Sequence, residues 1–227
     1  MHKHFPILVA FLILPTMCFG QDMNPRGDYS EHLYRVTLLR AAPGGLATLV
    51  DESRSYKQSM DGNVVIMRHS QGDHWDLMFL EPFDNNILNR RDWRVSFQDD
   101  LIASSDWNWQ RIKEAAASAG LFHIEMFQAA AGLENALLRE REMENEYLEA
   151  TGRNGNAIFV TRFGSDVDNF TIGFYPDMVT YATDPDLPDE VYHKAATDAG
   201  FASRSDIGFF LRQFIVGHND TLASQVR

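Results

Sequence analysis

The sequence predicts an α+β protein made of two tandem β-α-β-β-α-β units. Two observations support this fold class. Apolar residues alternate with a period of two in several short segments, as in strands, and other segments have the three-to-four-residue apolar spacing of helices. In addition, three blocks of sequence recur in the same order in the two halves of the chain, which indicates a duplication.

The internal repeat defines the extent of each unit. The paired blocks are residues 34–50 and 122–138, residues 64–82 and 157–176, and residues 100–104 and 220–224. Within the first pair, two alanines, a glycine and a leucine recur at the same spacing. Because the distance between paired blocks grows along the chain, the second copy is expected to contain insertions, chiefly between residues 177 and 205.

Each unit has the same expected order of elements. A strand runs into "APGG" or "AAG", an amphipathic helix follows, and a β-hairpin comes next around "SQGD" or "GSDVD". A second helix is expected near residues 207–215 in the second unit, whereas its counterpart in the first unit, residues 85–97, shows little periodicity. A last strand closes each unit. This order is that of the ferredoxin-like split β-α-β arrangement.

The chain therefore divides into five parts. Residues 1–20 are a predicted signal peptide, and residues 21–32 are a polar, flexible lead-in. The first ferredoxin-like repeat covers residues 33–106 and the second covers residues 121–227. Residues 107–120 form a predicted connecting helix between them.

The N-terminal segment has the layout of a secretory signal peptide. Lys3 precedes an apolar run, residues 5–14, that is too short to span a bilayer comfortably, and Gly20 is a small residue at the expected cleavage point. The alternatives are a membrane anchor, or a lipoprotein modified at Cys18, for which Met17 stands where a small residue is wanted. The protein is therefore expected to be exported, to the periplasm or out of the cell.

Composition and charge limit the classes of function. Cys18 is the only cysteine and lies in the signal peptide, so the mature chain should have neither a disulfide nor a thiolate. The formal net charge of -12 at pH 7 should repel nucleic acid and anionic membrane surfaces. No second apolar run is long enough to cross a membrane, so an integral membrane protein is not expected, and the oligomeric state is left open.

The two units resemble a known superfamily. Ferredoxin-like units whose first strand runs into "APG" or "AAG" before a helix are similar to the dimeric α/β-barrel superfamily, which includes antibiotic-biosynthesis monooxygenases, EthD and NIPSNAP proteins and chlorite dismutase relatives. The resemblance covers nearly all of residues 33–226. It implies two sheets paired face to face into an intrachain α/β barrel, with helices outside and a small-molecule cavity inside. No catalytic motif of a member matches residue by residue, so none is transferred.

The resemblance also bears on cofactors and partners. It implies a small organic molecule as the partner. Some haem-binding relatives use a helix histidine as axial ligand, and His193 lies on a predicted surface helix. A single histidine gives little support for haem, so we expect no cofactor and keep haem as the alternative.

Strand faces predict which polar residues line the barrel. The apolar face of the first strand, expected to lie under the helices, consists of Tyr34, Val36 and Leu38. The opposite face carries Arg35, and in the second copy it carries His123 and Glu125. In a barrel these polar residues would point into the interior, where each needs a partner or a ligand.

His123, Glu125 and Arg35 are therefore the catalytic candidates. Two residues apart on one strand, His123 and Glu125 have the spacing of an imidazole beside a carboxylate, which could abstract or relay a proton. Arg35 would attract an anionic or enolate-like group. The alternative is a satisfied internal salt bridge, such as Arg35 with Glu125.

Four further residues are ligand-binding candidates. The same alternation places His69, Asp76 and Tyr175 on the cavity side of their strands. His218 precedes the last strand and suits a cap or a rim position equally well. In the hairpin "RHSQGDHWDL", His69 and His74 could face each other across the turn, but two histidines need a third ligand to hold a metal ion, so no metal site is expected.

These features predict an exported small-molecule barrel protein. The favoured interpretation is a cofactor-independent enzyme that uses proton transfer or oxygenation. The alternative is a non-catalytic module that binds a small ligand or haem or assembles with a partner. An enzyme is expected to have a cavity in which several polar side chains converge, whereas a binding module need not have one. The sequence leaves open which of the two applies.

Overall fold

The computed structural model describes residues 22–83 and 93–227. The expected signal peptide, residues 1–20, lies outside these ranges, as does most of the segment expected to form the second helix of the first unit, residues 85–97. Within the described ranges, no helix combines the length and the apolar character needed to cross a membrane.

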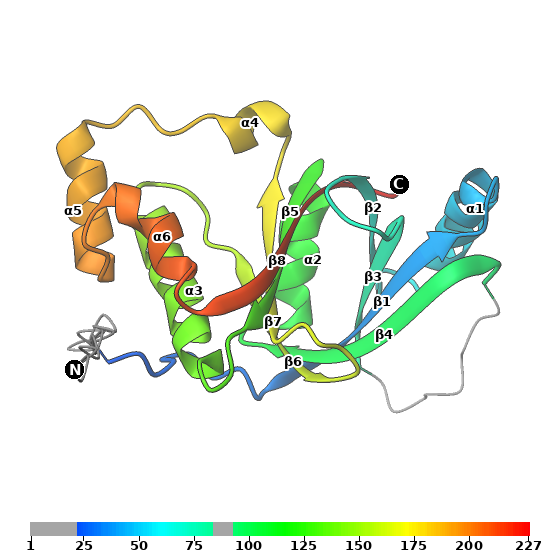
Figure 1. The fold of residues 1–227 in the computed structure, drawn as a ribbon. Coiled ribbons are helices and arrows are strands. Elements are labelled where there is room, and N and C mark those ends of the chain that lie inside the picture. Colours follow the sequence, from blue (N-terminus) through cyan, green and yellow to red (C-terminus); the bar gives the residue numbers. More distant parts are fainter. Residues whose placement is uncertain (1–21, 84–92) are drawn as a thin grey trace, which may run out of the picture.

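Eight strands form a closed antiparallel barrel (Figure 1). They are β1 (His32–Ala41), β2 (Val65–Gln71), β3 (Leu77–Pro82), β4 (Val95–Ser105), β5 (Leu121–Ala129), β6 (Ala157–Phe163), β7 (Asn169–Tyr175) and β8 (Ile215–Gln225). Their order around the barrel is β1-β3-β2-β8-β5-β7-β6-β4. The first unit supplies β4-β1-β3-β2 and the second supplies β8-β5-β7-β6. Because β2 pairs with β8 and β4 pairs with β6, the two units close into one barrel, which confirms the predicted fold class.

Helices cover the outside of this barrel. They are α1 (Leu46–Ser59), α2 (Trp109–Ser118), α3 (Glu134–Ala150), α4 (Met178–Ala182), α5 (Asp189–Ala199) and α6 (Ile207–Leu211), with a 3₁₀ turn η1 (Arg204–Asp206). In Figure 1, α3, α5 and α6 lie together at one side of the barrel and α1 lies at the opposite side. The connection between the units is helical, as expected, and Asn108 caps it by accepting a hydrogen bond from the amide of Arg111.

The second helix of the second unit is shorter than its apolar stripe suggests. α6 ends at Leu211, and Ile215 already begins β8. Between them, Phe214 is fully buried against Phe127 of β5 and Leu137 of α3. The apolar spacing over residues 207–215 therefore reflects a helix and a strand that bury side chains against the same surface, rather than one continuous helix.

The barrel interior is a packed apolar core, which corrects the expected assignment of the strand faces. The main core cluster includes residues from all eight strands, among them Tyr34, Val36 and Leu38 of β1 and Phe122, Ile124 and Met126 of β5. The face that was expected to lie under the helices therefore points inward. Alternation separates two faces but does not say which is inside, because both faces of these strands are covered.

The opposite strand faces meet the helix layer. Leu39 of β1 packs against Leu49 and Val50 of α1. Phe127 of β5 packs against Leu137 of α3. The alternate residues of β1 and β5, including the polar candidates, consequently lie on the outer face of the sheet, which the helices cover in part.

One end of the barrel is closed by the connecting helix. Ile112 and Ala116 of α2 belong to the interior cluster. The hydroxyl of Tyr34 donates a 2.5 Å hydrogen bond to the carbonyl of Trp107, whose ring stacks on Phe174 with 5.8 Å between centroids. These contacts fill the end of the barrel at which β1 and β5 begin.

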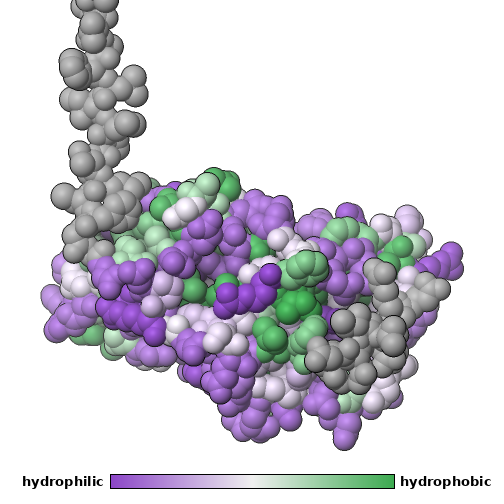
Figure 2. Space-filling view, turned by 90° about the horizontal axis from the view of Figure 1, so that it is seen from below, coloured by the Kyte–Doolittle hydropathy of each residue, from purple (hydrophilic) through white to green (hydrophobic). Residues whose placement is uncertain are grey.

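The face of the molecule drawn in Figure 2 is mostly hydrophilic, in keeping with the acidic composition. Figure 2 shows polar residues over most of one face, with apolar areas of limited extent between them. Part of the expected lead-in lies along α3, because the backbone amides of Arg26 and Gly27 and the hydroxyl of Tyr29 all donate to the carboxylate of Glu142.

Candidate functional site

Four titratable side chains come together on the outer face of β5 and β8. His123 and Glu125 lie on β5, and His218 and Asp220 lie on β8. In the strand register Glu125 is directly opposite Asp220, and Phe127 is opposite His218. The contacts are diagonal, as neighbours two residues apart allow. His123 Nε2 is 2.7 Å from Asp220 Oδ1, and His218 Nε2 is 3.3 Å from Glu125 Oε1. We call these four residues the histidine–carboxylate cluster.

Helix α3 and strand β7 enclose the buried side of the cluster. Glu125 is 9% exposed. Its Oε2 accepts a hydrogen bond from the hydroxyl of Thr171 on β7 at 3.4 Å and lies 3.6 Å from Nη1 of Arg141 on α3. The imidazole of His218 stacks on Phe127, with ring centroids 5.0 Å apart. Glu125 is thus fixed from three sides, whereas Asp220 is exposed at the edge.

Opposing effects set the protonation of His123 and Glu125. Burial alone would lower the pKa of His123, but the hydrogen bond with Asp220 and the charge of Glu125 outweigh it, so the pKa is raised. Burial alone would raise the pKa of Glu125, but the bond from His218 and the charge of Arg141 hold that pKa at about 2. The geometry therefore favours an imidazolium beside two carboxylates when no other cation is bound.

Helix α3 adds further carboxyl groups around Arg141. Nη2 of Arg141 is 2.5 Å from Glu140 Oε2, and Nη1 is 2.5 Å from Glu144 Oε2. Burial raises the pKa of Glu140 to about 7, and burial also raises the pKa of Glu144. One buried guanidinium thus serves three carboxyl groups, those of Glu140, Glu144 and Glu125.

The third catalytic candidate, Arg35, does not reach this cluster. Arg35 lies on β1, and three strands separate β1 from β5 in either direction around the barrel. Both residues face outward, so the packed interior lies between them. The expected pair of Arg35 with Glu125 is therefore wrong, and Arg141 of α3 takes the place beside Glu125.

His69 and Asp76 belong to the hairpin end of the first unit. His69 Nε2 accepts a hydrogen bond from the amide of Asp73 at 3.1 Å, and its ring lies 5.5 Å from that of Trp75. Asp76 Oδ2 accepts a 2.8 Å bond from the amide of Ala41, which ties β3 to the end of β1. His74 pairs with the carboxylate of Asp73 at 2.6 Å rather than with His69. These bonds define a polar turn.

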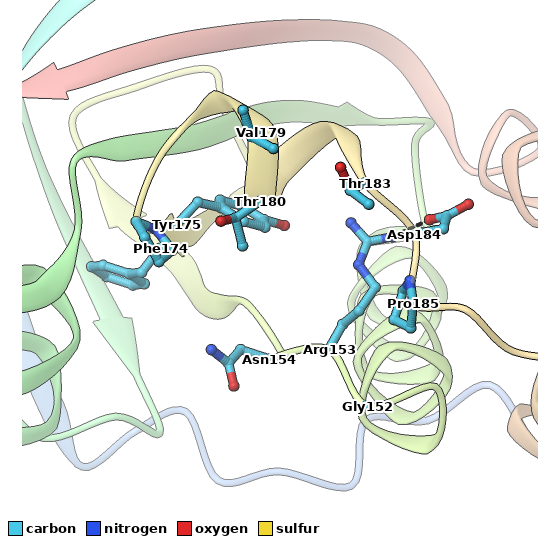
Figure 3. A pocket seen from close by; sticks show the side chains of 11 residues that line it. Gly152, Arg153, Asn154, Phe174, Tyr175, Val179, Thr180, Thr183, Asp184 and Pro185 are labelled. Carbon is cyan, nitrogen blue, oxygen red and sulfur yellow. Dashed lines mark hydrogen bonds and ion pairs between the residues drawn. The ribbon is translucent and has the colours of Figure 1, made fainter.

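Tyr175 lines a pocket of about 430 Å³ beneath α4. Figure 3 shows that the pocket lies between α4, the end of β7 and the loop after α3, with Arg153 and Asp184 facing each other at one side and Phe174 at the other. The lining residues are Gly152, Arg153, Asn154, Phe174, Tyr175, Pro176, Val179, Thr180, Thr183, Asp184 and Pro185.

Two tyrosines connect this pocket with the histidine–carboxylate cluster. In the register of β5 and β7, His123 is opposite Gly173, and a Cβ at Gly173 would lie only 2.7 Å from Cε2 of Tyr175. The glycine thus leaves room for the ring of Tyr175 next to His123. The ring of Tyr181 on α4 lies 5.1 Å from that of Tyr175 and 5.1 Å from that of His123. Tyr175 and Tyr181 therefore lie between the cluster and the pocket.

Sequence reasoning missed Asp220, Arg141 and Tyr181. A signal for Asp220 exists, because His-Asn-Asp at 218–220 has the same histidine-to-acid spacing as His-Ile-Glu at 123–125. The internal repeat also aligns Asp220 with Asp100. Arg141 and Tyr181 come from helices whose position over the sheet no sequence pattern specifies.

The first unit carries a polar version of the same arrangement without histidines. Asp100 of β4 accepts a 2.6 Å hydrogen bond from Thr37 of β1 and a 2.7 Å bond from Gln98. By the repeat, Thr37 corresponds to Glu125 and Gln98 corresponds to His218. The second unit alone therefore combines imidazoles with carboxylates at this place.

The cluster has donor atoms for a cation. One atom each from His123, Glu125 and Asp220 lies within 4.8 Å of the others. Haem, by contrast, does not fit the histidine that the resemblance suggested. His193 is on the exposed side of α5, and the inner side of that helix packs through Tyr192 and Ala196 against α3. We therefore assign no chemistry to haem.

Comparisons with known proteins identify the fold. No protein-family model and no curated protein matches the sequence. An anthrone oxidase-like protein of known structure shares 9% identity over 88% of this chain and 92% of its own, with a TM-score of 0.56. A candidate monooxygenase from Fusobacterium nucleatum shares 9% identity over 88% and 94%, with a TM-score of 0.52. A candidate chlorite dismutase shares 14% identity over 86% and 95%, with a TM-score of 0.51. At these identities the likeness shows the fold alone, which this chain shares with all three proteins.

Proposed function

We propose that this protein is an exported enzyme that acts on a small organic molecule bound beneath α4. The observation that carries the proposal is the pocket of about 430 Å³ that shares Tyr175 with the surroundings of His123. Export rests on the signal-peptide layout of residues 1–20. The volume of the pocket falls in the range of small-molecule sites, which is roughly 300–1,000 Å³.

The lining of the pocket suits a flat, mostly apolar molecule with a polar edge. Phe174, Tyr175 and Pro185 offer ring surfaces, while Thr180 offers a hydroxyl. Arg153 pairs with Asp184 at 3.2 Å, and Arg204 pairs with the same carboxylate at 2.6 Å, so positive charge remains at this side of the pocket for the polar edge of a ligand. Apolar walls with a few polar groups are typical of small-molecule sites.

The neighbouring cluster would supply the chemistry. An imidazole held by a carboxylate, such as His123 with Asp220, can move a proton to or from a bound molecule. Proton removal from a carbon acid could be the whole reaction, or it could precede oxygenation by O₂. Proteins that share this fold include an anthrone oxidase-like protein and a candidate monooxygenase, and these descriptions support the second course.

Ligand-observed NMR with a panel of phenols and cyclic ketones, anthrone included, tests the pocket. At least one compound should bind, and Thr180→Trp, which fills the pocket, should remove that binding. Thr197→Trp on the exposed side of α5 is the matched control and should bind normally. Binding that survives Thr180→Trp would place the ligand elsewhere.

One observation favours the non-catalytic alternative. The side chains of the cluster are bonded to one another, as they would be in a purely structural network. Incubation of the bound compound with O₂, followed by mass spectrometry of the products, separates the two functions. An enzyme should convert the compound and lose that activity in His123→Ala, whereas a binding module should return it unchanged.

A further inference from the structure

Two carboxylates face each other directly across β5 and β8. Glu125 and Asp220 are register partners on the same face of the sheet. Like charges at directly opposite positions destabilise a strand pair unless a cation or a proton lies between them. The imidazole nitrogen of His123 is the nearest basic group to Asp220, at 2.7 Å. The two carboxylates would be stabilised by a cation at this position. One imidazole nitrogen and two carboxylate oxygens are available there to bind it.

The positive charge that Arg141 brings to Glu125 is shared with two other carboxyl groups. Around Glu125, the carboxyl groups of Glu140 and Glu144 share a single guanidinium, that of Arg141. Asp220 adds a further negative charge at the edge. A metal ion would take the place of the imidazolium proton, and the resulting ligand set of one neutral imidazole and two carboxylates has a charge of about -2, which one divalent cation would cancel.

We propose that His123, Glu125 and Asp220 bind one divalent first-row transition-metal ion. The ligand atoms would be Nε2 of His123 and one carboxylate oxygen from each acid, which lie within 4.8 Å of one another. Mixed imidazole and carboxylate donors suit Zn²⁺, Mn²⁺, Fe²⁺ or Co²⁺, whereas Mg²⁺ and Ca²⁺ prefer oxygen alone.

Neighbouring groups hold the proposed ligands in place. The carboxylate of Glu125 is oriented by three side chains, those of Thr171 at 3.4 Å, His218 at 3.3 Å and Arg141 at 3.6 Å. Such outer partners tune a metal site. The side chain of Asp220 is 53% exposed, so an ion can enter from solvent and keep a water molecule as an additional ligand. The site stands on this geometry and does not depend on the pocket beneath α4.

The first unit provides an internal comparison. At the positions that match the three proposed ligands it has Arg35, Thr37 and Asp100, and Asp100 accepts hydrogen bonds from Thr37 and from Gln98. No imidazole is present there, so the inference is one metal ion per chain. Asp100 is consequently a matched control for Asp220.

Titration of EDTA-treated mature protein with Co²⁺, followed by visible absorption and calorimetry, tests the site. The unmodified protein should saturate at one ion per chain. His123→Ala and Asp220→Asn should each weaken binding by at least about tenfold, whereas Asp100→Asn should not change it. Absence of binding up to about 1 mM Co²⁺, or equal binding by all variants, would overturn the proposal.

A second measurement needs no substitution near the core. In the unmodified protein, bound Co²⁺ should shift or broaden the NMR signals of the His123 and His218 imidazoles and leave that of the exposed His193 unchanged. Equal effects on all histidines would mean non-specific binding and would refute the site. Thr180→Trp should still bind Co²⁺, so a failure of the metal site and a failure of the proposed pocket remain distinguishable.

Discussion

Glu125 and Glu140 show how single residues at this site differ although they share Arg141. Both are buried carboxyl groups beside the same guanidinium. Glu125 has additional hydrogen-bond partners in His218 and Thr171, and its pKa is lowered to about 2. Glu140 lacks such donors, and burial lifts its pKa to about 7. Because both carboxyl groups are buried, the number of their hydrogen-bond and charge partners accounts for the difference between their pKa values.

The raised pKa of Glu140 predicts a loss of stability as the pH rises. Between about pH 4.5 and pH 7 the folded protein keeps the Glu140 proton while the unfolded chain releases it. The contribution of Glu140 is therefore fully present below pH 4.5 and lost as the pH passes 7. In metal-free protein, Glu140→Gln should remove this slope and gain, relative to the unmodified protein, on the order of 2 kcal/mol at pH 8.

Urea unfolding at pH 4.5 and pH 8 measures this effect. Glu52→Gln on α1 is the control, because Glu52 occupies the matching position of the first unit and is exposed. It should leave the pH dependence unchanged. Parallel pH curves for the unmodified protein and Glu140→Gln would show that Glu140 is ionised in the folded state.

At the residue scale, the sequence identified His123 and Glu125 but not their surroundings. Alternation placed both residues on one strand face, and the structure agrees. The sequence predicted that this face points into the barrel, whereas it points outward. Alternation cannot distinguish the two sides, because both the interior and the helix layer are apolar. Arg35 was misplaced for the same reason. Arg141 was missed because the packing of α3 over the sheet, which brings it to Glu125, is a tertiary contact that no local pattern reports.

At the scale of elements, the hairpin tips join the two units. Gly72, in the hairpin between β2 and β3, has φ of +115°, and a Cβ there would lie 1.9 Å from the carbonyl oxygen of Asp220. Gly164, in the corresponding hairpin of the second unit, has φ of +96°, and a Cβ there would lie 2.4 Å from the carbonyl oxygen of Asp100. Each tip thus touches the closing strand of the other unit.

Gly72→Ala should therefore destabilise the protein more than an ordinary turn glycine would. Gly62→Ala is the control, because Gly62 also has a positive φ, +78°, but nothing within 4 Å of the added Cβ. The control should cost about 1 kcal/mol, and Gly72→Ala should cost about 1–3 kcal/mol more. Thermal melts compare the two directly. Equal losses would mean that the hairpin tip does not approach β8 this closely.

The sequence predicted the order of elements better than their lengths. The strands, the first helix of each unit and the connecting helix follow from local periodicity, which depends on neighbours along the chain. The extent of α6 depends on Phe214 packing beneath α3, and the place of α4 depends on Tyr181 meeting Tyr175. These contacts are tertiary, so no local pattern reports them.

At the scale of the whole molecule, neither unit has a complete core. The interior cluster draws residues from all eight strands, and the seams β2–β8 and β4–β6 pair strands of different units. A separated unit would expose both an apolar sheet face and two strand edges. The duplication therefore builds one cooperative structure rather than two linked domains.

Isolated fragments should consequently fail to fold on their own. Fragments 33–106 and 121–226 should show no cooperative thermal transition when each is measured separately. Mixing them should restore part of the native circular dichroism if the seams reform. A sharp melting transition in either fragment alone would show that a half-barrel is stable without its partner.

We propose that the reactive groups of this protein lie outside the barrel, between the sheet of the second unit and its helices. Anomalous X-ray diffraction at the cobalt edge, from crystals grown with Co²⁺, tests that location most directly. We predict one strong peak between His123, Glu125 and Asp220. A map with no peak there, or with a peak only at the hairpin of His69 and His74, would contradict it.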